Sequence, residues 1–279
     1  MKNFLYHYCS IESLACILHN RTLKFNNLTK VDDPEEAVTA DMGNFGRLCY
    51  VSCWTNNPQE SIPMWNLYTP NGHGVRIRMK EFPFVMYHYK KGEYLLDKDA
   101  DSYINLKRIY DENKVIVVPD SLKLLQVNYT DDVSKLFPIV KETSYYDFDG
   151  NLVDISTITG ERQVKYNTKL DFSRIGRFKR ENWAFEHEWR YIISTTPMGF
   201  QEAIPWTQAS HDEFVRRLSQ TDSAPPCDEL YLDISQDAID SMEILLGPNV
   251  TEAEEIIIRS LIKEYAPACL IRKSTFNKA

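Results

Sequence analysis

Two glutamates and an arginine lie close together in the segment WAFEHEWRYII, residues 183–193. If this segment is one β-strand, alternate side chains point to opposite faces, so Glu186, Glu188 and Arg190 share a face. Unpaired charges are costly to bury in apolar packing. This face therefore either contacts solvent or lines a polar cleft. In a cleft, two neighbouring carboxylates raise one another's pKa, and the arginine opposes that rise.

Other side chains with chemical potential lie in the N-terminal part of the chain. His7 lies in an expected first strand, where a lone histidine is commonly a hydrogen-bonded core residue. Ser52 shares one face of an expected strand with Tyr50 and Trp54. No G-x-S-x-G motif surrounds Ser52, which argues against a serine hydrolase. The alternation alone leaves core packing and ligand binding both open for these residues.

An acidic cluster precedes the expected strand of Ser52. Asp32, Asp33 and Glu36 flank a proline that begins a short helix, and acids near a helix start are commonly solvated. With Glu186 and Glu188 they could instead bind a hard metal ion. The spacing of these acids matches no dedicated metal-binding loop, so both interpretations stay open.

The expected elements alternate in a way that favours an α+β fold, with central mixed or antiparallel β-sheets flanked by helices. We expect one domain over residues 1–279, with a probable insertion at 81–160. The segment 144–154 is predicted to be a surface loop. Predicted strands lie at 4–9, 22–27, 48–54, 75–79, 114–120, 122–129, 228–234, 242–249 and 268–274, and predicted helices at 11–20, 63–68, 91–113 and 251–265.

Composition narrows the classes of partner. The net charge of −8 argues against a broad electrostatic contact with nucleic acid, although a local basic site stays open. No apolar run has the length of a signal peptide or a transmembrane helix, so no membrane partner is expected. The six cysteines are scattered without a CxxC pair, which favours reduced thiols in a cytoplasmic protein and no structural metal.

Five blocks of the sequence carry a resemblance to a known family. In order along the chain they are LYHYCSIESLACIL, TLKFNNLTKVDDPEEA, YVSCWTNNPQESIPMWNLYTPNGHGVRI, WAFEHEWRYII and ILLGPNVTEAEE. Together they resemble the bacterial domain-of-unknown-function family 2971. Two departures from the family pattern occur in the acidic cluster: Asp32 replaces the usual Asn, and Glu35 replaces the usual aromatic residue.

The opening strand and helix are also similar to the NAD-binding half of ADP-ribosyltransferases. That resemblance implies a strand-borne His7, a hydroxyl on a second strand from Ser52 or Tyr50, and a late-strand carboxylate from Glu188 or Glu186. It implies NAD as the substrate and a carboxylate that stabilises an oxocarbenium-like transition state. The further binding residues that this interpretation assigns are Tyr8, Trp54 and Trp65 for stacking or packing and Arg190 for orienting the carboxylate or contacting the pyrophosphate.

Three functions follow as hypotheses. The first is an NAD-consuming, ADP-ribosyltransferase-like enzyme with an open choice of acceptor, in a toxin or phage-defence setting that only the resemblance implies. The second is a metal-dependent nuclease or phosphoesterase that uses the acids named above. The third is a ligand- or protein-binding module without turnover. The first requires His7, a side chain from the Ser52 strand and one of the two glutamates to meet in one cleft.

Overall fold

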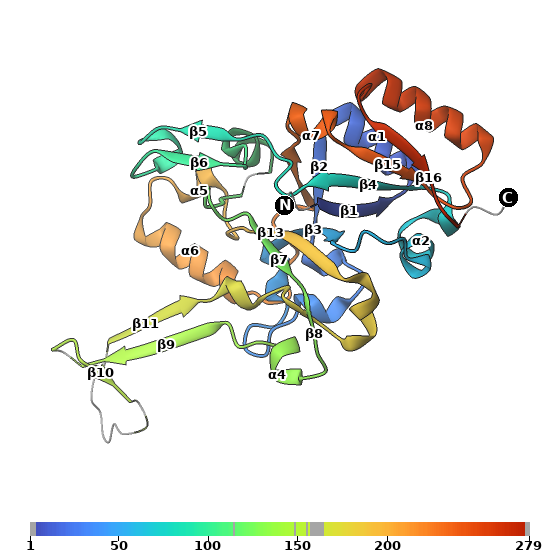
Figure 1. The fold of residues 1–279 in the computed structure, drawn as a ribbon. Helices are drawn as coiled ribbons and strands as arrows, with labels where there is room; N and C mark the ends of the chain where they lie inside the picture. Colours follow the sequence, from blue (N-terminus) through green and yellow to red (C-terminus); the bar gives the residue numbers. More distant parts are fainter. Residues whose placement is uncertain (1–3, 114, 148, 155, 157–164, 277–279) are drawn as a thin grey trace.

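A nine-stranded mixed sheet forms the centre of the molecule in the computed structural model, which describes residues 4–113, 115–147, 149–154, 156 and 165–276 (Figure 1). Antiparallel pairs predominate, and β15 and β16 pair in parallel. The strands of this sheet are β1 (Phe4–Cys9), β2 (Thr22–Asn27), β3 (Cys49–Thr55), β4 (Val75–Lys80), β7 (Lys123–Gln126), β13 (Glu188–Ser194), β14 (Glu229–Asp233), β15 (Glu243–Leu246) and β16 (Leu270–Lys273).

The remaining elements surround this sheet. The helices are α1 (Ile11–Asn20), α2 (Ile62–Tyr68), α3 (Leu106–Arg108), α4 (Val133–Leu136), α5 (Phe200–Ala203), α6 (Gln208–Ser219), α7 (Gln236–Asp240) and α8 (Glu252–Tyr265). The small sheets pair β5 (Tyr87–Tyr89) with β6 (Ala100–Ser102), β8 (Asn128–Tyr129) with β12 (Phe178–Lys179), and β9 (Lys141–Tyr146) with β10 (Leu152–Val153) and β11 (Lys165–Leu170). The strands β9 and β11 extend away from the body of the molecule (Figure 1).

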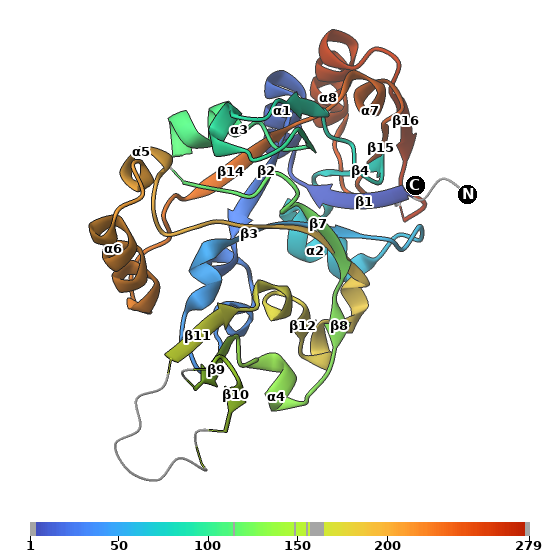
Figure 2. The same cartoon turned by 90° about the vertical axis from the view of Figure 1, so that its left-hand side faces the viewer.

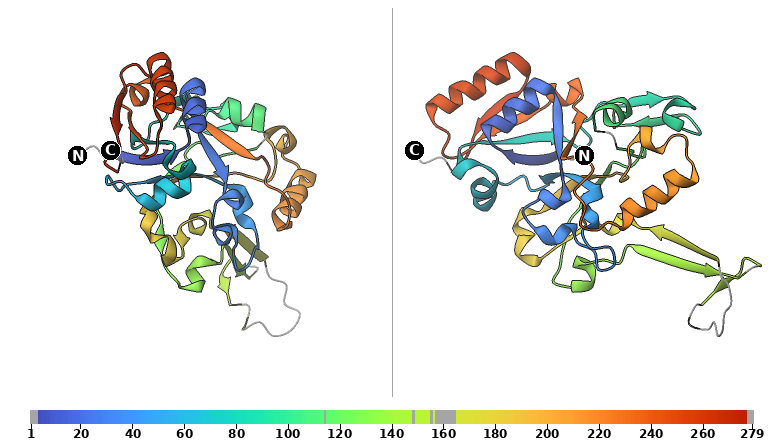
Figure 3. Two further views of the ribbon diagram at one scale, coloured as in Figure 1. Left: turned by 90° about the vertical axis from the view of Figure 1, so that its right-hand side faces the viewer. Right: turned by 180° about the vertical axis from the view of Figure 1, so that it is seen from behind.

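The predicted helices at 11–20 and 251–265 are confirmed as α1 and α8. The Ser10 side chain caps α1 by accepting a hydrogen bond from the Ser13 amide at 3.2 Å. Thr251 and Glu254 form a capping box at the start of α8. α1 and α8 lie side by side on one face of the sheet, as Figure 3 shows from behind.

Strand β3 is the branch point of the sheet. One edge of β3 pairs with β13 along its whole length. The opposite edge pairs with β2 near one end and with β1 at the other, and β1 runs across the direction of β2 and β3 (Figure 2). The paired residues on this second edge are Asn26 with Val51, Asn27 with Tyr50, and Tyr6 with Thr55. Among the described residues, the middle of β3 therefore has ladder partners only on its β13 side.

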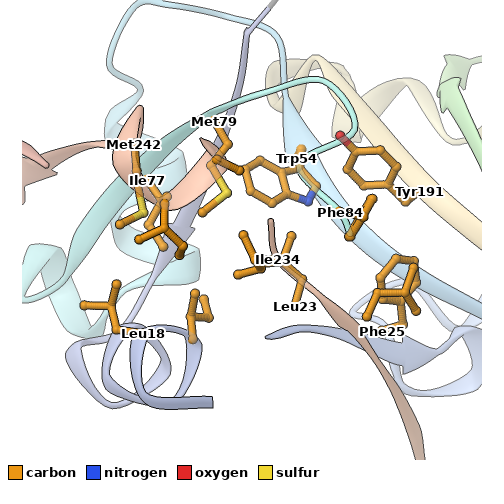
Figure 4. Close-up of a cluster of buried hydrophobic side chains, with 14 of the residues drawn as sticks. Leu18, Leu23, Phe25, Trp54, Ile77, Met79, Phe84, Tyr191, Ile234 and Met242 are labelled. Carbon is orange, nitrogen blue, oxygen red and sulfur yellow. The ribbon is translucent and has the colours of Figure 1, made fainter. Parts of the chain in front are cut away.

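The main hydrophobic core lies between the sheet and its covering helices. Trp54 of β3 and Tyr191 of β13 extend into it from neighbouring strands, and Leu18 of α1 closes it from the helical side (Figure 4). Leu18 is 0% exposed, and the indole of Trp54 meets the Tyr191 ring edge-on, with 6.2 Å between ring centroids. Burial of such aromatic side chains supplies much of the hydrophobic stabilisation of a core.

The middle of the chain differs from the sequence-based expectation in three places. The predicted helix with its lead-in at 91–113 is confirmed only over its last part, Leu106–Asn113, because Gly92 and Tyr94 have left-handed backbone conformations and β6 occupies Ala100–Ser102. The predicted strand at 114–120 is wrong over its described part, where only Val117 forms a bridge, to Thr195. The predicted loop at 144–154 contains strand residues of the β9–β10 hairpin, apart from residue 148, which lies outside the described ranges.

The α+β class and the mixed central sheet flanked by helices are confirmed, in a single domain. Segment 81–160 supplies β7 to the large sheet, where it pairs with β13. Within the described ranges, no helix has both the length and the apolar character needed to cross a membrane.

Candidate functional site

A cleft of about 520 Å³ opens where β1 and β2 diverge from β3. Its walls come from β1, α1 and β2, and the middle of β3 lies between them. Acidic and basic side chains from the loop after β2, from β12 and from β13 complete the lining. The cleft volume is in the range typical of small-molecule sites.

His7 bridges the two strands that separate at the cleft. Its Nδ1 lies 2.8 Å from the main-chain oxygen of Cys53. A carbonyl only accepts hydrogen bonds, so Nδ1 carries the proton and Nε2 of the neutral ring keeps its lone pair. Burial lowers the pKa of His7, although the bond to Cys53 acts in the opposite direction. His7 is therefore a cleft-lining side chain whose neutral ring can accept a hydrogen bond at Nε2.

The two glutamates of the WAFEHEWRYII segment reach the cleft by a route that alternation did not predict. Glu186 ends the 3₁₀ helix Glu181–Glu186, and β13 begins only at Glu188. His187 between them adopts a left-handed conformation with φ of 46°. The prediction of one continuous strand is therefore wrong. The alternative of a solvent-exposed face is also wrong, because Glu186 and Glu188 are 3% and 4% exposed.

Lys179 and Arg190 hold the carboxylates in a buried ion cluster, defined here as Glu36, Lys179, Glu186, Glu188 and Arg190. The Lys179 Nζ lies 2.7 Å from Glu186 Oε2, 3.3 Å from Glu188 Oε2 and 3.5 Å from Glu36 Oε1. Arg190 donates from Nε to Glu188 Oε1 at 2.8 Å and from Nη1 to Glu36 Oε2. Every member is at most 6% exposed. Three acids and two bases give a formal charge of −1.

The cluster separates the pKa values of its three acids. Burial raises the pKa of Glu36 and of Glu186 above the ordinary range of a glutamate. Burial also opposes ionisation of Glu188, but the charges of Arg190 and Lys179 outweigh it and lower the pKa of Glu188 to about 2. Divergent pKa values in neighbouring acids are the arrangement that acid–base chemistry uses. Glu188 is the ionised member, while Glu36 and Glu186 retain protons more readily.

Two side chains outside the cluster orient the glutamates. The Tyr68 hydroxyl, from α2, donates to Glu186 Oε1. The Tyr129 hydroxyl accepts a hydrogen bond from the Glu188 amide at 2.8 Å. Sequence reasoning assigned no role to Lys179, because it lies in the two-residue strand β12 without a recognisable motif. Two buried glutamates need a cation to neutralise them, and this need is the one signal that indicates a lysine or arginine beside them.

Most of the sequence-predicted site residues line this cleft. The Ser52 hydroxyl accepts a hydrogen bond from the Trp54 indole at 3.1 Å, so these two neighbours on β3 are already linked. The Tyr8 hydroxyl accepts a hydrogen bond from the Ser61 amide at 3.2 Å. The predicted residues that line the cleft are His7, Tyr8, Ser52, Trp54, Glu186, Glu188 and Arg190.

Tyr50 and Trp65, which were expected to contact a ligand, are absent from the cleft lining. The Tyr50 hydroxyl instead donates to the main-chain oxygen of Cys227 at 2.9 Å. The Trp65 ring packs edge-on against Tyr8, with 4.7 Å between centroids, and its indole donates to Glu60 at 3.1 Å. Both side chains are almost completely buried, and both have their polar atoms satisfied within the protein.

Of the five acids of the metal hypothesis, Glu36, Glu186 and Glu188 belong to the ion cluster around Lys179, whereas Asp32 and Asp33 do not. Asp33 Oδ1 accepts a hydrogen bond from the Glu35 amide at 3.0 Å, and Asp32 is an exposed residue of the cleft rim. Within the described part of the chain, no group of three or more His, Cys, Asp or Glu side chains is arranged to hold a metal ion. The buried glutamates contact Lys179 and Arg190, which already neutralise most of their charge.

Comparison with known families covers the part of the chain that carries most of the ion cluster. Residues 64–191 match the model of a family described as "Protein of unknown function (DUF2971)". The chain carries a DUF2971 region. This region includes Tyr68 at one end and Glu186, Glu188 and Arg190 at the other, so the family resemblance is confirmed there. No curated protein and no solved structure matched the chain.

Proposed function

We propose that the cleft binds NAD or a related nucleotide and cleaves its nicotinamide–ribose bond, in an ADP-ribosyltransferase or NAD glycohydrolase reaction. The observation that carries the proposal is the meeting of His7, Ser52 and Glu188 in the lining of one cleft, although they belong to β1, β3 and β13. This is the juxtaposition that the ADP-ribosyltransferase-like hypothesis requires, and neither alternative requires it.

The chemistry assigns a separate part to each group. When the bond between ribose C1 and the nicotinamide nitrogen breaks, its electron pair leaves with nicotinamide, whose pyridinium charge is cancelled. The positive charge that develops on the ribose faces Glu188, which stays ionised because its pKa is about 2. Water or an acceptor then forms the new bond to C1. Glu186, whose burial raises its pKa, is the better placed carboxylate to take the proton that this nucleophile loses.

Nucleotide binding draws on the walls of the cleft. The neutral His7 accepts a hydrogen bond from a ribose hydroxyl through Nε2, and the ring of Tyr6, which lines the cleft, offers a surface for a planar base. All six cysteines are unpaired, which suits action in a reducing compartment such as the cytoplasm. A toxin or phage-defence setting belongs to the same proposal and comes from the resemblance to ADP-ribosyltransferases.

The test is release of nicotinamide from NAD, followed by chromatography, with the wild-type protein and with Glu188→Gln. We expect the substitution to lower the rate by about 10²–10³-fold. Glu35→Gln is the matched control, because Glu35 forms an ion pair with Arg180 on the surface and does not line the cleft. Since Glu188→Gln also disturbs the ion cluster, Ser52→Ala supplies a second variant, for which we expect a lower rate in a folded protein.

Two results would overturn the catalytic proposal. One is wild-type protein that releases no nicotinamide above the buffer rate. The other is a folded Glu188→Gln protein, verified by circular dichroism, that reacts as fast as the wild type.

One observation favours a second candidate, a nucleotide-binding module without turnover. Glu188 already contacts both Arg190 and Lys179, so part of its hydrogen-bonding capacity is used within the protein. This candidate predicts a saturable rise in melting temperature with NAD and no nicotinamide release. The enzyme proposal predicts both the rise and the release, so the two measurements together separate the candidates.

A further inference from the structure

A second, smaller cavity of about 160 Å³ lies beside the C-terminal end of α6. It shares no lining residue with the cleft. Three arginines from two distant parts of the chain meet there, whereas the other lining residues are neutral. The lining consists of Arg47, Pro197, Arg216, Arg217, Gln220, Ser223, Ala224 and Pro226.

Arg47 is the most buried of the three arginines, with 1% of its surface exposed. Its Nη2 donates to the main-chain oxygens of Arg217 and Leu218, at 2.8 and 3.4 Å. These carbonyls belong to the last turn of α6, where the helix dipole favours a cation. Arg47 thus caps the helix, and this contact accounts for one of its nitrogens.

The other guanidinium nitrogens of Arg47 donate no such hydrogen bond to the described residues. Its Nε is buried without a hydrogen-bond acceptor among the described residues. No described carboxylate lies within ion-pair distance of its guanidinium, in contrast to the other buried arginine, Arg190. Burial lowers the pKa of Arg47 from its usual value. A buried guanidinium without a carboxylate partner is costly, and the negative charge of an anionic ligand in the adjoining cavity would offset that cost.

The two arginines of α6 leave the cavity positive. Arg217 is occupied by Glu202, Glu213 and the Pro197 carbonyl. Arg216 uses Nε and Nη2 for the same Glu213 and is more exposed. Three arginines and two glutamates sum to a formal charge of +1, and neither glutamate lines the cavity. The cavity lining therefore contains three arginines and no carboxylate.

We propose that this cavity is a binding site for a phosphate ion or the phosphoryl group of a phosphate monoester. Arg47 would bind the oxyanion from the buried side, and Arg216 from the rim. Guanidinium groups suit this role because their planar, forked donors match phosphate oxygens. The space equals that of about five water molecules at roughly 30 Å³ each, so a phosphoryl group fits but a whole nucleotide does not.

The test measures melting temperature against increasing inorganic phosphate, phenyl phosphate or sodium chloride, at equal ionic strength. We expect saturable stabilisation by phosphate and none by chloride. Comparable stabilisation by phenyl phosphate identifies a monoester site that is open to solvent. Stabilisation by inorganic phosphate alone identifies a site for the free ion. Equal shifts with chloride and both phosphates would overturn the proposal.

Variants tie the binding to the cavity. We expect Arg216→Gln to weaken phosphate binding about three- to tenfold, through loss of one charge-assisted contact. Arg259→Gln is the matched control, because Arg259 is an exposed helical arginine paired with Glu255 on α8, outside the cavity. If the Arg47→Met protein folds, we expect it to bind no phosphate. If it does not fold, the comparison of Arg216→Gln with Arg259→Gln tests the proposal. Equal affinity of the Arg216 and Arg259 variants would contradict the proposal.

Discussion

His7 and Cys53 are joined by a hydrogen bond of 2.8 Å from the imidazole Nδ1 to a main-chain carbonyl. The bond connects β1 to the part of β3 that has no ladder partner on that side among the described residues. It therefore replaces a missing backbone hydrogen bond at the point where the sheet opens. The same bond fixes the imidazole tautomer, so one contact both stabilises the opened sheet and presents Nε2 to the cleft.

The environment of His7 predicts a loss of stability in mild acid. Because burial lowers its pKa in the folded protein, the unfolded chain binds a proton more readily below about pH 6.5. The contribution of His7 is complete above that pH and is lost as the pH falls towards the folded pKa. We expect His7→Gln to flatten this part of the profile of unfolding free energy, measured by urea denaturation between pH 7.5 and 5. Parallel profiles for the two proteins would contradict the prediction.

Glu188→Gln should destabilise the protein as well as slow the proposed reaction. The substitution leaves Arg190 and Lys179 without one of their carboxylates, and removal of one partner of a buried ion pair typically costs about 3–5 kcal/mol. Because the folded pKa is about 2 against the usual 4.5, the wild-type advantage is present above pH 4.5 and declines as the pH falls towards 2. Urea denaturation at pH 7 and pH 3.5 measures the stability cost of the substitution and its dependence on pH. An equal cost at the two pH values would contradict this account.

Tyr68→Phe isolates one hydrogen bond of the site. The hydroxyl of Tyr68 donates to the buried Glu186, and a hydrogen bond to a charged group contributes about 1.5–3 kcal/mol. We expect a loss of stability of that size, with the helix α2 retained. Tyr265→Phe is a control, because the Tyr265 hydroxyl contacts the exposed His19 and should contribute no more than about 0.5 kcal/mol. Equal costs for the two tyrosines would show that Tyr68 supports no ion cluster.

Lys179 and Glu186 should be energetically coupled. Lys179→Met leaves three buried carboxylates against Arg190 alone, and we expect a strong destabilisation at pH 7. Glu186→Gln in the same protein removes one of the uncompensated charges and should restore part of the stability. A double-mutant cycle measured by urea denaturation should give a coupling energy of about 0.5–3 kcal/mol. Additive single effects would argue against a direct interaction.

The sequence blocks that suggested a family also supply every member of the ion cluster except Lys179, and they supply Tyr68, which contacts the cluster. Glu36 comes from the acidic block after β2, Tyr68 from the MWNLY block, and Glu188 and Arg190 from the EHEWR block. Only the second and third of these blocks fall within the DUF2971 region. These motifs are far apart in the sequence, but each contributes at least one side chain to a single buried network of ion pairs and hydrogen bonds.

Local structure was largely predictable because its causes act over a few residues. The predicted helices at 11–20 and 251–265 and the predicted alternation in β3 were confirmed for that reason. The prediction of one continuous strand over WAFEHEWRYII failed at a single residue, but the contacts made at that point come from other parts of the chain. One left-handed residue, His187, interrupts the strand, and the contacts of Glu186 with Lys179 and Tyr68 accompany that turn.

The sequence by itself determined the α+β class, the principal strands and helices, and a set of site residues most of which line the cleft. Only the tertiary structure decided that the glutamates are buried, and which cations neutralise them. Arg190 and Glu36 are 154 positions apart, and no local pattern encodes a pair at that separation. Alternation specifies the face of a strand on which a side chain lies. The fold decides what covers that face, and burial among opposite charges then sets the pKa of the side chain.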